Sequence, residues 1–234
     1  MSEHVFSTRR ALAAGAISLL ALAAPGLAKA DLLLAGSTIA LSGTTSAAEP
    51  QLAGTIVEDR LDSFSFAGAH GTVSGSIQSR VIRAIDGTLD FYWRVFSDAN
   101  SSDDLGSFRL GEEHTTDYRV NWRTDGAGDV GASSATRFTG GFSSYFNFNF
   151  SHMNPAGAIV GLGANQSSFF MFLDTDATSY ARTGIMDVAD MTQTHIAKTL
   201  LTFAPAAATV PEPGSLALVG LALGAVAARR RRQR

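Results

Sequence analysis

The chain has 234 residues and a formal net charge of −3, and 45% of its residues are apolar. It contains no Cys, which excludes disulfide frameworks, thiolate metal sites and cysteine catalysis. The charged fraction of 17% and the many aromatic residues indicate a folded protein rather than a disordered one. Ala and Leu are concentrated at the two ends, so we interpret the ends separately from the middle.

The N-terminal segment, residues 1–30, has the layout of a secretory signal peptide. Arg9 and Arg10 precede an apolar run of 14 residues. At about 1.5 Å per residue, such a helix is too short for a hydrocarbon core of ~30 Å. Small residues at Ala28 and Ala30 suit a signal peptidase, so we predict a signal helix that is removed after Ala30. The alternative is a buried Ala/Leu helix, and the paired arginines leave both the general and the twin-arginine export routes open.

The middle of the chain, residues 31–205, is the predicted extracellular domain. Residues 31–210 contain 10 of the 18 basic and 19 of the 21 acidic residues, a net charge of −9. Because an acidic surface repels the phosphate backbone, we expect no nucleic-acid partner.

Period-two alternation predicts β-strands in this domain. In residues 89–95 the odd positions are apolar, whereas Asp90 and Arg94 are polar, which is typical of a strand with one buried face. Alternation or a short apolar run marks further strands at 73–81, 118–123, 142–150, 169–173 and 196–203. Turn-forming residues separate them. We therefore predict an all-β antiparallel β-sandwich, with a jelly-roll or barrel as the alternative, in which residues 31–50 are an edge strand or a loose arm.

Two acidic loops are candidate calcium sites. Asp125 and Asp129 share a Gly-rich loop, and Asp174 and Asp176 follow a predicted strand. Oxygen-rich loops can bind calcium outside the cell, although the EF-hand spacing is absent and Asp is also an ordinary turn former. We expect no cofactor other than this candidate calcium.

Two tyrosines are candidate sugar contacts. Exposed aromatic rings can stack on sugars, but the alternation places most aromatic residues of the domain in the core. Tyr92 and Tyr145 have the parity opposite to their aromatic neighbours, so we predict that these two rings face outward as ligand contacts.

The sequence lacks a catalytic signature. It contains no Gly-x-Ser-x-Gly elbow, no His-Glu-x-x-His motif and no phosphate-binding loop. We therefore expect a protein that is not an enzyme. The alternative is a secreted hydrolase whose site is assembled from separated loops around His114, Asp125 and Asp129.

The C-terminal segment, residues 206–234, combines a linker with three elements. In order, these are a proline motif (Val210, Pro211, Glu212, Pro213), an apolar helix at 215–228 and an arginine-rich tail at 229–234 that begins with Arg229, Arg230, Arg231 and Arg232. The prolines favour an extended, accessible chain. Arginines that flank an apolar helix stop its transfer and stay on the cytoplasmic side, so the domain lies on the other side of the membrane. The apolar helix has only 14 residues, so we predict a short transmembrane helix that anchors the chain transiently.

The three elements, in this order at the C-terminus, resemble the PEP-CTERM sorting signal of exported bacterial proteins. The resemblance implies that a membrane-embedded exosortase with a cysteine nucleophile recognises Pro211, Glu212 and Pro213, cuts nearby and passes the protein to the outer envelope or to exopolysaccharide. The implied partners are this exosortase-type enzyme, the export machinery, signal peptidase and exopolysaccharide.

The resulting hypothesis is an exported, non-enzymatic protein of the cell surface or extracellular matrix. It would have a structural, adhesive or polysaccharide-associated role in biofilm. A plain C-terminal membrane anchor behind a Pro-rich linker is the alternative interpretation of the tail.

Overall fold

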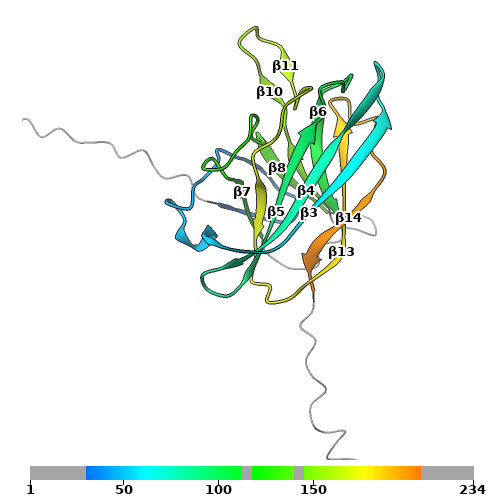
Figure 1. Ribbon diagram of the computed structural model, residues 1–234. Helices are drawn as coiled ribbons and strands as arrows, with labels where there is room; N and C mark the ends of the chain where they lie inside the picture. The colour runs from blue at the N-terminus through cyan, green and yellow to red at the C-terminus, as the bar shows by residue number, and fades with distance from the viewer. Residues whose placement is uncertain (1–29, 112–117, 140–144, 207–234) are drawn as a thin grey trace, which may run out of the picture.

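The structure is a computed structural model that describes residues 30–111, 118–139 and 145–206 (Figure 1). These residues form fourteen β-strands and one short 3-10 helix, η1. The strands are β1 (Asp31–Leu33), β2 (Thr38–Ala40), β3 (Gly54–Ala67), β4 (Thr72–Ala84), β5 (Leu89–Ser97), β6 (Leu105–Gly111), β7 (Tyr118–Trp122), β8 (Ser134–Phe138), β9 (Tyr145–Asn149), β10 (His152–Met153), β11 (Ile159–Val160), β12 (Met171–Asp174), β13 (Tyr180–Asp190) and β14 (Leu200–Pro205), and η1 is Pro50–Leu52. The predicted signal helix and C-terminal helix lie outside the described residues.

Two six-stranded sheets contain most of the strands. Sheet A has the order β1-β7-β12-β5-β4-β3, and sheet B has the order β14-β13-β6-β9-β8-β2. Every pairing between named strands is antiparallel. The all-β, antiparallel prediction is therefore confirmed. The segment predicted as an edge strand or loose arm supplies one edge of each sheet, β1 and β2.

Aromatic side chains from both sheets form one core. The ring centroids of Trp93 on β5 and Phe108 on β6 lie 5.9 Å apart, and those of Tyr118 on β7 and Phe146 on β9 lie 4.9 Å apart. The indole Nε1–H of Trp93 donates to Thr202 Oγ1 on β14 at 2.7 Å. Burial of each such ring contributes about 1.5–3 kcal/mol, so these contacts hold the inner faces of the two sheets together.

The outer face of sheet A differs from the prediction of a solvated face. Asp90 and Tyr92, on the outward side of β5, are only 1% and 2% exposed. Tyr92 belongs to a second apolar cluster, which includes Leu52 of η1, Phe172 of β12 and Ala30. The alternation of β5 is real, but a separate segment of the chain buries the side that was expected to face water.

This covering segment, residues 41–53, is held on sheet A by hydrogen bonds to β7 and the loop after it. The Gly43 N–H donates to the buried Asn121 Oδ1 at 2.9 Å, and the Arg123 guanidinium donates to the Leu52 carbonyl at 3.1 Å. Gly43 has φ of +77°, and an added Cβ would lie 2.8 Å from the Trp122 ring. Glycine is therefore required where the covering segment meets sheet A.

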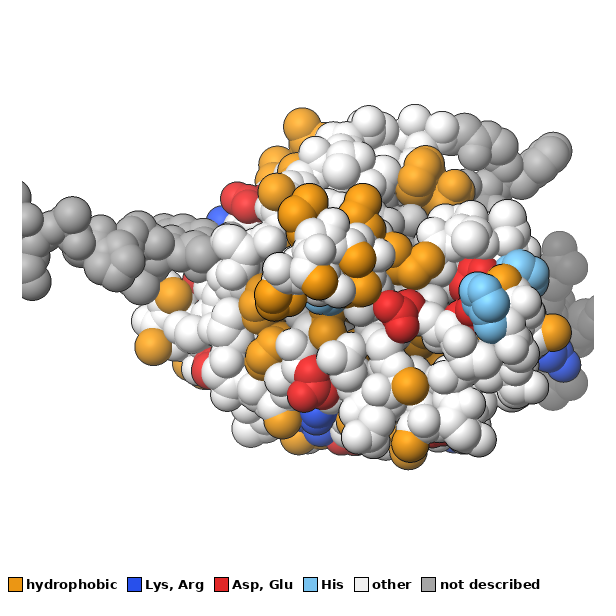
Figure 2. Space-filling view, turned by 90° about the horizontal axis from the view of Figure 1, so that it is seen from above, with side chains coloured by type: hydrophobic (Ala, Val, Ile, Leu, Met, Phe, Trp, Pro, Cys, Tyr) orange, Lys and Arg blue, Asp and Glu red, His pale blue; other side chains and the backbone are white. Residues whose placement is uncertain are grey.

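A small hairpin, β10–β11, stands out from one end of the two sheets, whereas β14 ends near the opposite end of the domain (Figure 1). Met153 and Ile159 of this hairpin are 71% and 69% exposed. Seen from that end, hydrophobic side chains gather on the surface beside a few acidic and histidine side chains (Figure 2). β14, the last described strand, thus ends away from this apolar hairpin.

Candidate functional site

Of the two tyrosines predicted to face outward, Tyr145 has an accessible ring. It is 37% exposed on β9, whereas its neighbours Phe146 and Phe148 are buried in the core. The ring stacks on Phe138 of β8, with centroids 4.4 Å apart and an angle of 13° between the planes. The ring of Tyr145 therefore faces outward, as the alternation along this strand predicts.

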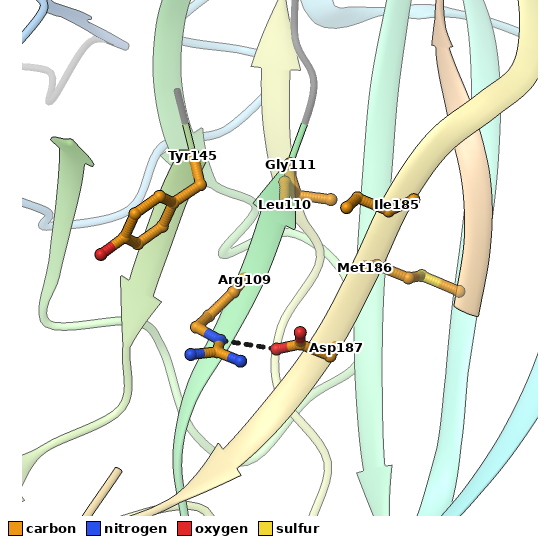
Figure 3. Close-up of a pocket in the computed structure, with 7 residues that line it drawn as sticks. All are labelled: Arg109, Leu110, Gly111, Tyr145, Ile185, Met186 and Asp187. Carbon is orange, nitrogen blue, oxygen red and sulfur yellow. Dashed lines mark hydrogen bonds and ion pairs between the residues drawn. The ribbon is translucent and has the colours of Figure 1, made fainter. Parts of the chain in front are cut away.

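Tyr145 borders a pocket on the outer face of sheet B, the Tyr145 pocket, with a volume of about 240 Å³ (Figure 3). Its other walls come from β6 and β13, and they include Arg109, Ile185 and Asp187. Arg109 Nε donates to Asp187 Oδ1 at 2.5 Å, so the pair holds both planar groups at the pocket wall. An aromatic ring beside a guanidinium and a carboxylate offers a stacking surface with hydrogen-bonding groups for hydroxyls, and the small volume limits the ligand to about one sugar ring.

Tyr92, the other predicted contact, is not an exposed ring. Its ring stacks on Phe172 with centroids 5.3 Å apart, beneath the covering segment. Its hydroxyl lies 3.5 Å from Arg123 Nη1. Burial, reinforced by the nearby Asp90, raises the pKa of Tyr92, so the hydroxyl stays protonated. The prediction of an accessible Tyr92 ring is wrong because sequence alternation does not report a covering segment from elsewhere in the chain.

Tyr92 instead lines a second pocket, the arginine pocket, on the outer face of sheet A. This pocket has a volume of about 470 Å³. It includes three guanidinium groups, from Arg80 on β4, Arg94 on β5 and Arg123 after β7. One carboxylate, from Asp125, belongs to its lining. No local sequence pattern indicates this site, because its arginines come from separate segments of the chain.

Asp125 and Asp129, the first candidate calcium loop, engage different partners. Both Asp125 oxygens accept hydrogen bonds from Arg123, at 2.7 and 2.8 Å, and Ser46 donates to Asp125 through its amide and hydroxyl. The bonds from Arg123 are the main cause that lowers the pKa of Asp125. Asp129 Oδ2 accepts two hydrogen bonds from Ser167, at 2.8 and 2.9 Å, which lower its pKa.

Asp174 and Asp176, the second candidate loop, line a pocket of about 420 Å³ that also includes Asp86 and Arg119. Burial raises the pKa of Asp174. Within residues 30–111, 118–139 and 145–206, no three acidic or histidine side chains are grouped closely enough to hold a metal ion. Calcium binding at either loop stays a prediction.

Asp90 is a buried carboxyl group at a position that the alternation of β5 predicts to face solvent. Neither carboxyl oxygen has a hydrogen-bond partner among the described residues. Burial is the main cause that raises the pKa of Asp90 to about 8; Asp174 and Asp86 add to this shift, whereas the nearby Thr175 backbone and Arg123 oppose it. The group is therefore mostly a neutral acid at pH 7.

The described histidines belong to separate local contacts. His70 pairs with Asp103, and His195 Nδ1 lies 2.7 Å from Asp190 Oδ2. His152 Nδ1 contacts a backbone carbonyl oxygen at 3.0 Å. His114, which the hydrolase alternative requires, lies outside the described residues. Asp125 and Asp129, its proposed partners, are occupied by the hydrogen bonds given above.

Ala30, predicted as the last residue of the signal peptide, belongs to the folded domain. Its N–H donates to the buried Glu49, and its carbonyl accepts from Arg119 Nε and Nη2 at 3.3 and 3.1 Å. A cut after Ala30 removes both interactions and creates an α-ammonium group on Asp31, one residue from the present donor to Glu49. The other predicted processing and sorting residues, Ala28 and those from Val210 to Pro213 and Arg229 to Arg232, lie outside the described residues.

The C-terminal segment matches a known family model, described as the PEP-CTERM protein-sorting motif, over residues 209–232. The chain carries a PEP-CTERM sorting signal. The resemblance inferred from the proline motif, the apolar stretch and the arginines is thus confirmed. No curated protein and no solved structure matches the chain.

The PEP-CTERM signal implies export, sorting to the cell surface and processing by an exosortase. Pro211, Glu212 and Pro213 lie within the matched residues. Among the residues that the structure describes, no helix has the length and apolar character needed to cross a membrane.

Proposed function

We propose that this chain is an exported, non-enzymatic surface protein with a β-sandwich domain that is delivered to the extracellular matrix by an exosortase. The PEP-CTERM signal at residues 209–232 carries this proposal. The acidic domain and the two sheets that share one core are consistent with a structural or adhesive module. The structural, adhesive and biofilm parts of the role are proposals that the sorting signal motivates.

The C-terminal helix acts in this proposal as a transient anchor. Its 14 apolar residues fall short of the length that usually spans a bilayer, and the arginines behind it stop its transfer. Intact-mass analysis of the protein from its native compartment tests this step. The mass of the mature parent protein is expected to lack the arginine tail. The Glu212→Ala variant is expected to retain it. A surface form that still ends in Arg234 would establish the plain-anchor alternative.

The domain associates with polysaccharide in this proposal, and the Tyr145 pocket supports that role. Tyr145 offers a half-exposed ring, and the Arg109–Asp187 pair offers fixed donors and acceptors. On a glycan array, Tyr145→Ala is expected to lose binding to neutral sugars. Leu61→Ala is the matched control, because Leu61 is an exposed apolar side chain on sheet A, and it is expected to bind as the parent does. Equal binding by Tyr145→Ala and the parent would remove the pocket from the proposal.

The non-enzymatic part is tested by glycosidase assays on the purified protein. No release of reducing ends is expected. Hydrolysis that is abolished by Asp125→Asn but retained in Asp176→Asn would favour the hydrolase alternative.

A further inference from the structure

The arginine pocket gathers cationic side chains on a domain that is acidic overall. Residues 31–210 have a net charge of −9, yet three of their ten basic side chains line this one pocket. Arg80 is paired with Asp59 and Arg123 with Asp125, so Arg94 is the lining arginine without an ion-pair partner among the described residues. A concave site with clustered positive charge concentrates anions locally, even on a protein that is acidic overall.

Arg80 and Arg94 leave sheet A on the same face. Arg80 lies directly opposite Tyr92 in the β4–β5 register, and Arg94 is two residues further along β5. Residues in such diagonal positions are about 7–8 Å apart at most, so both guanidinium groups are within reach of one ligand group.

Both guanidinium groups are fixed through the same pair of nitrogens. Arg80 uses Nε and Nη2 on Asp59, and Arg94 uses Nε on the Ser168 carbonyl and Nη2 on Ser167 Oγ. Within the described residues, Nη1 of each arginine has no hydrogen-bond partner. Both side chains are therefore oriented in advance, and each retains donors for a ligand.

Aromatic rings hold the planes of the two groups. The Arg80 guanidinium carbon lies 4.6 Å from the centroid of Phe170, and that of Arg94 lies 4.6 Å from the centroid of Phe96. These contacts reduce the entropy lost on binding, because the side chains are already ordered. Burial is the main cause that lowers the pKa of Arg94; the charge of Arg80 adds to this shift, whereas the carboxylate of Asp129 opposes it.

Arg123 stabilises the wall of the pocket and is not a proposed ligand contact. Its Nε and Nη2 bind Asp125, and its Nη1 binds the Leu52 carbonyl. It fixes the covering segment that forms one wall of the pocket, and its charge is balanced by Asp125.

We propose that the arginine pocket binds the carboxylate of an acidic sugar, a hexuronate unit of a polysaccharide, through Nη1 of Arg80 and Arg94. Guanidinium groups match the planar geometry of a carboxylate, and apolar side chains such as Ile56 and Phe170 supply a surface for the sugar ring. The sugar part of this inference rests on the proposed polysaccharide association, whereas the anion part rests on the pocket alone. The pocket volume of about 470 Å³ exceeds the volume of about 240 Å³ of the Tyr145 pocket, whose one arginine, Arg109, is paired with Asp187.

Titration calorimetry of the purified protein tests the inference with a glucuronate oligosaccharide, a glucose oligosaccharide of equal length and sodium acetate. The glucuronate is expected to bind, and Arg94→Gln and Arg80→Gln are each expected to weaken it by about tenfold or more, as for a lost charged hydrogen bond. Arg60→Gln is the matched control, because Arg60 is a largely exposed arginine outside the pocket, and it is expected to leave binding unchanged.

A second measurement does not depend on the folding of any variant. Added NaCl is expected to weaken glucuronate binding to the parent protein, because the contact is ionic. Glucuronate binding that is insensitive to salt and to both substitutions would overturn the inference. Acetate binding as tight as that of glucuronate would overturn its sugar part.

Failure of this inference is distinguishable from failure of the proposed function. If neutral sugars bind through Tyr145 while glucuronate does not bind, the proposed function stands and the arginine pocket is excluded. If glucuronate binding depends on Arg80 and Arg94 but the surface form keeps its arginine tail, the inference stands and the sorting step fails.

Discussion

Replacement of Asp90 by Asn should change how the stability of the domain depends on pH. The carboxyl group is buried without a partner, and its pKa in the folded protein is about 8, compared with 3.8 for an exposed Asp. The folded state therefore keeps a proton between about pH 4 and pH 8 that the unfolded state releases. By linkage, the free energy of unfolding falls as pH rises through this window and levels off above pH 8.

The magnitude follows from the size of the pKa difference. Each unit corresponds to about 1.4 kcal/mol, so a difference of about four units amounts to roughly 5 kcal/mol, a large part of a typical stability of 5–15 kcal/mol. The amide of Asn is also buried but does not ionise. Asp90→Asn should therefore match the parent at about pH 4 and below, and exceed it by several kcal/mol near pH 9.

Chemical denaturation of the parent and the variant at intervals from pH 4 to pH 9 measures this effect. Other groups face Asp90, namely Asp174, Asp86 and Arg123, and Asp174 titrates in the same direction, so Asp90→Asn should reduce the slope without abolishing it. Asp176→Asn, which removes an exposed carboxylate nearby, serves as the control and should preserve the slope. Parallel pH profiles for the parent and Asp90→Asn would refute the reasoning.

Three further outcomes are expected. Gly43→Ala should lower the free energy of unfolding by about 1–3 kcal/mol in a denaturant titration, because the backbone is left-handed there and the new Cβ meets the Trp122 ring; no loss would mean that the covering segment shifts freely. Phe108→Ala should lower it by about 3–5 kcal/mol by opening a cavity between the two sheets, and a loss below about 1 kcal/mol would contradict the shared core. The double substitution of Met153 and Ile159 by Ser should leave the melting temperature unchanged but raise solubility, since both side chains are mostly exposed. A large fall in melting temperature would show that the hairpin is packed.

Calcium binding at the loops of Asp125 and Asp129 and of Asp174 and Asp176 can be measured with the same melting assay. If either acidic loop binds the ion, calcium should raise the melting temperature and EDTA should reverse the rise. A melting temperature that neither reagent moves would remove calcium from both loops.

Local patterns predicted several elements well. The alternation at residues 89–95 and 118–123 corresponds to β5 and β7, and the run at 169–173 overlaps β12. The longest strand, β3, was not predicted from the sequence. It is an edge strand that is exposed along most of its length, so it lacks an alternating apolar face. Its extended form comes from pairing along β4, a partner that the local sequence does not reveal.

The sequence by itself determined that this protein carries a sorting signal, because such a signal is a short linear motif whose elements are neighbours along the chain. It also determined the strand class, since alternation is a local property of the backbone. Only the tertiary structure decided that Asp90 and Tyr92 are buried and that Arg80, Arg94 and Arg123 surround one pocket. Those facts depend on strand register and on a covering segment about 40 residues earlier in the chain, and such long-range packing is set by the whole fold.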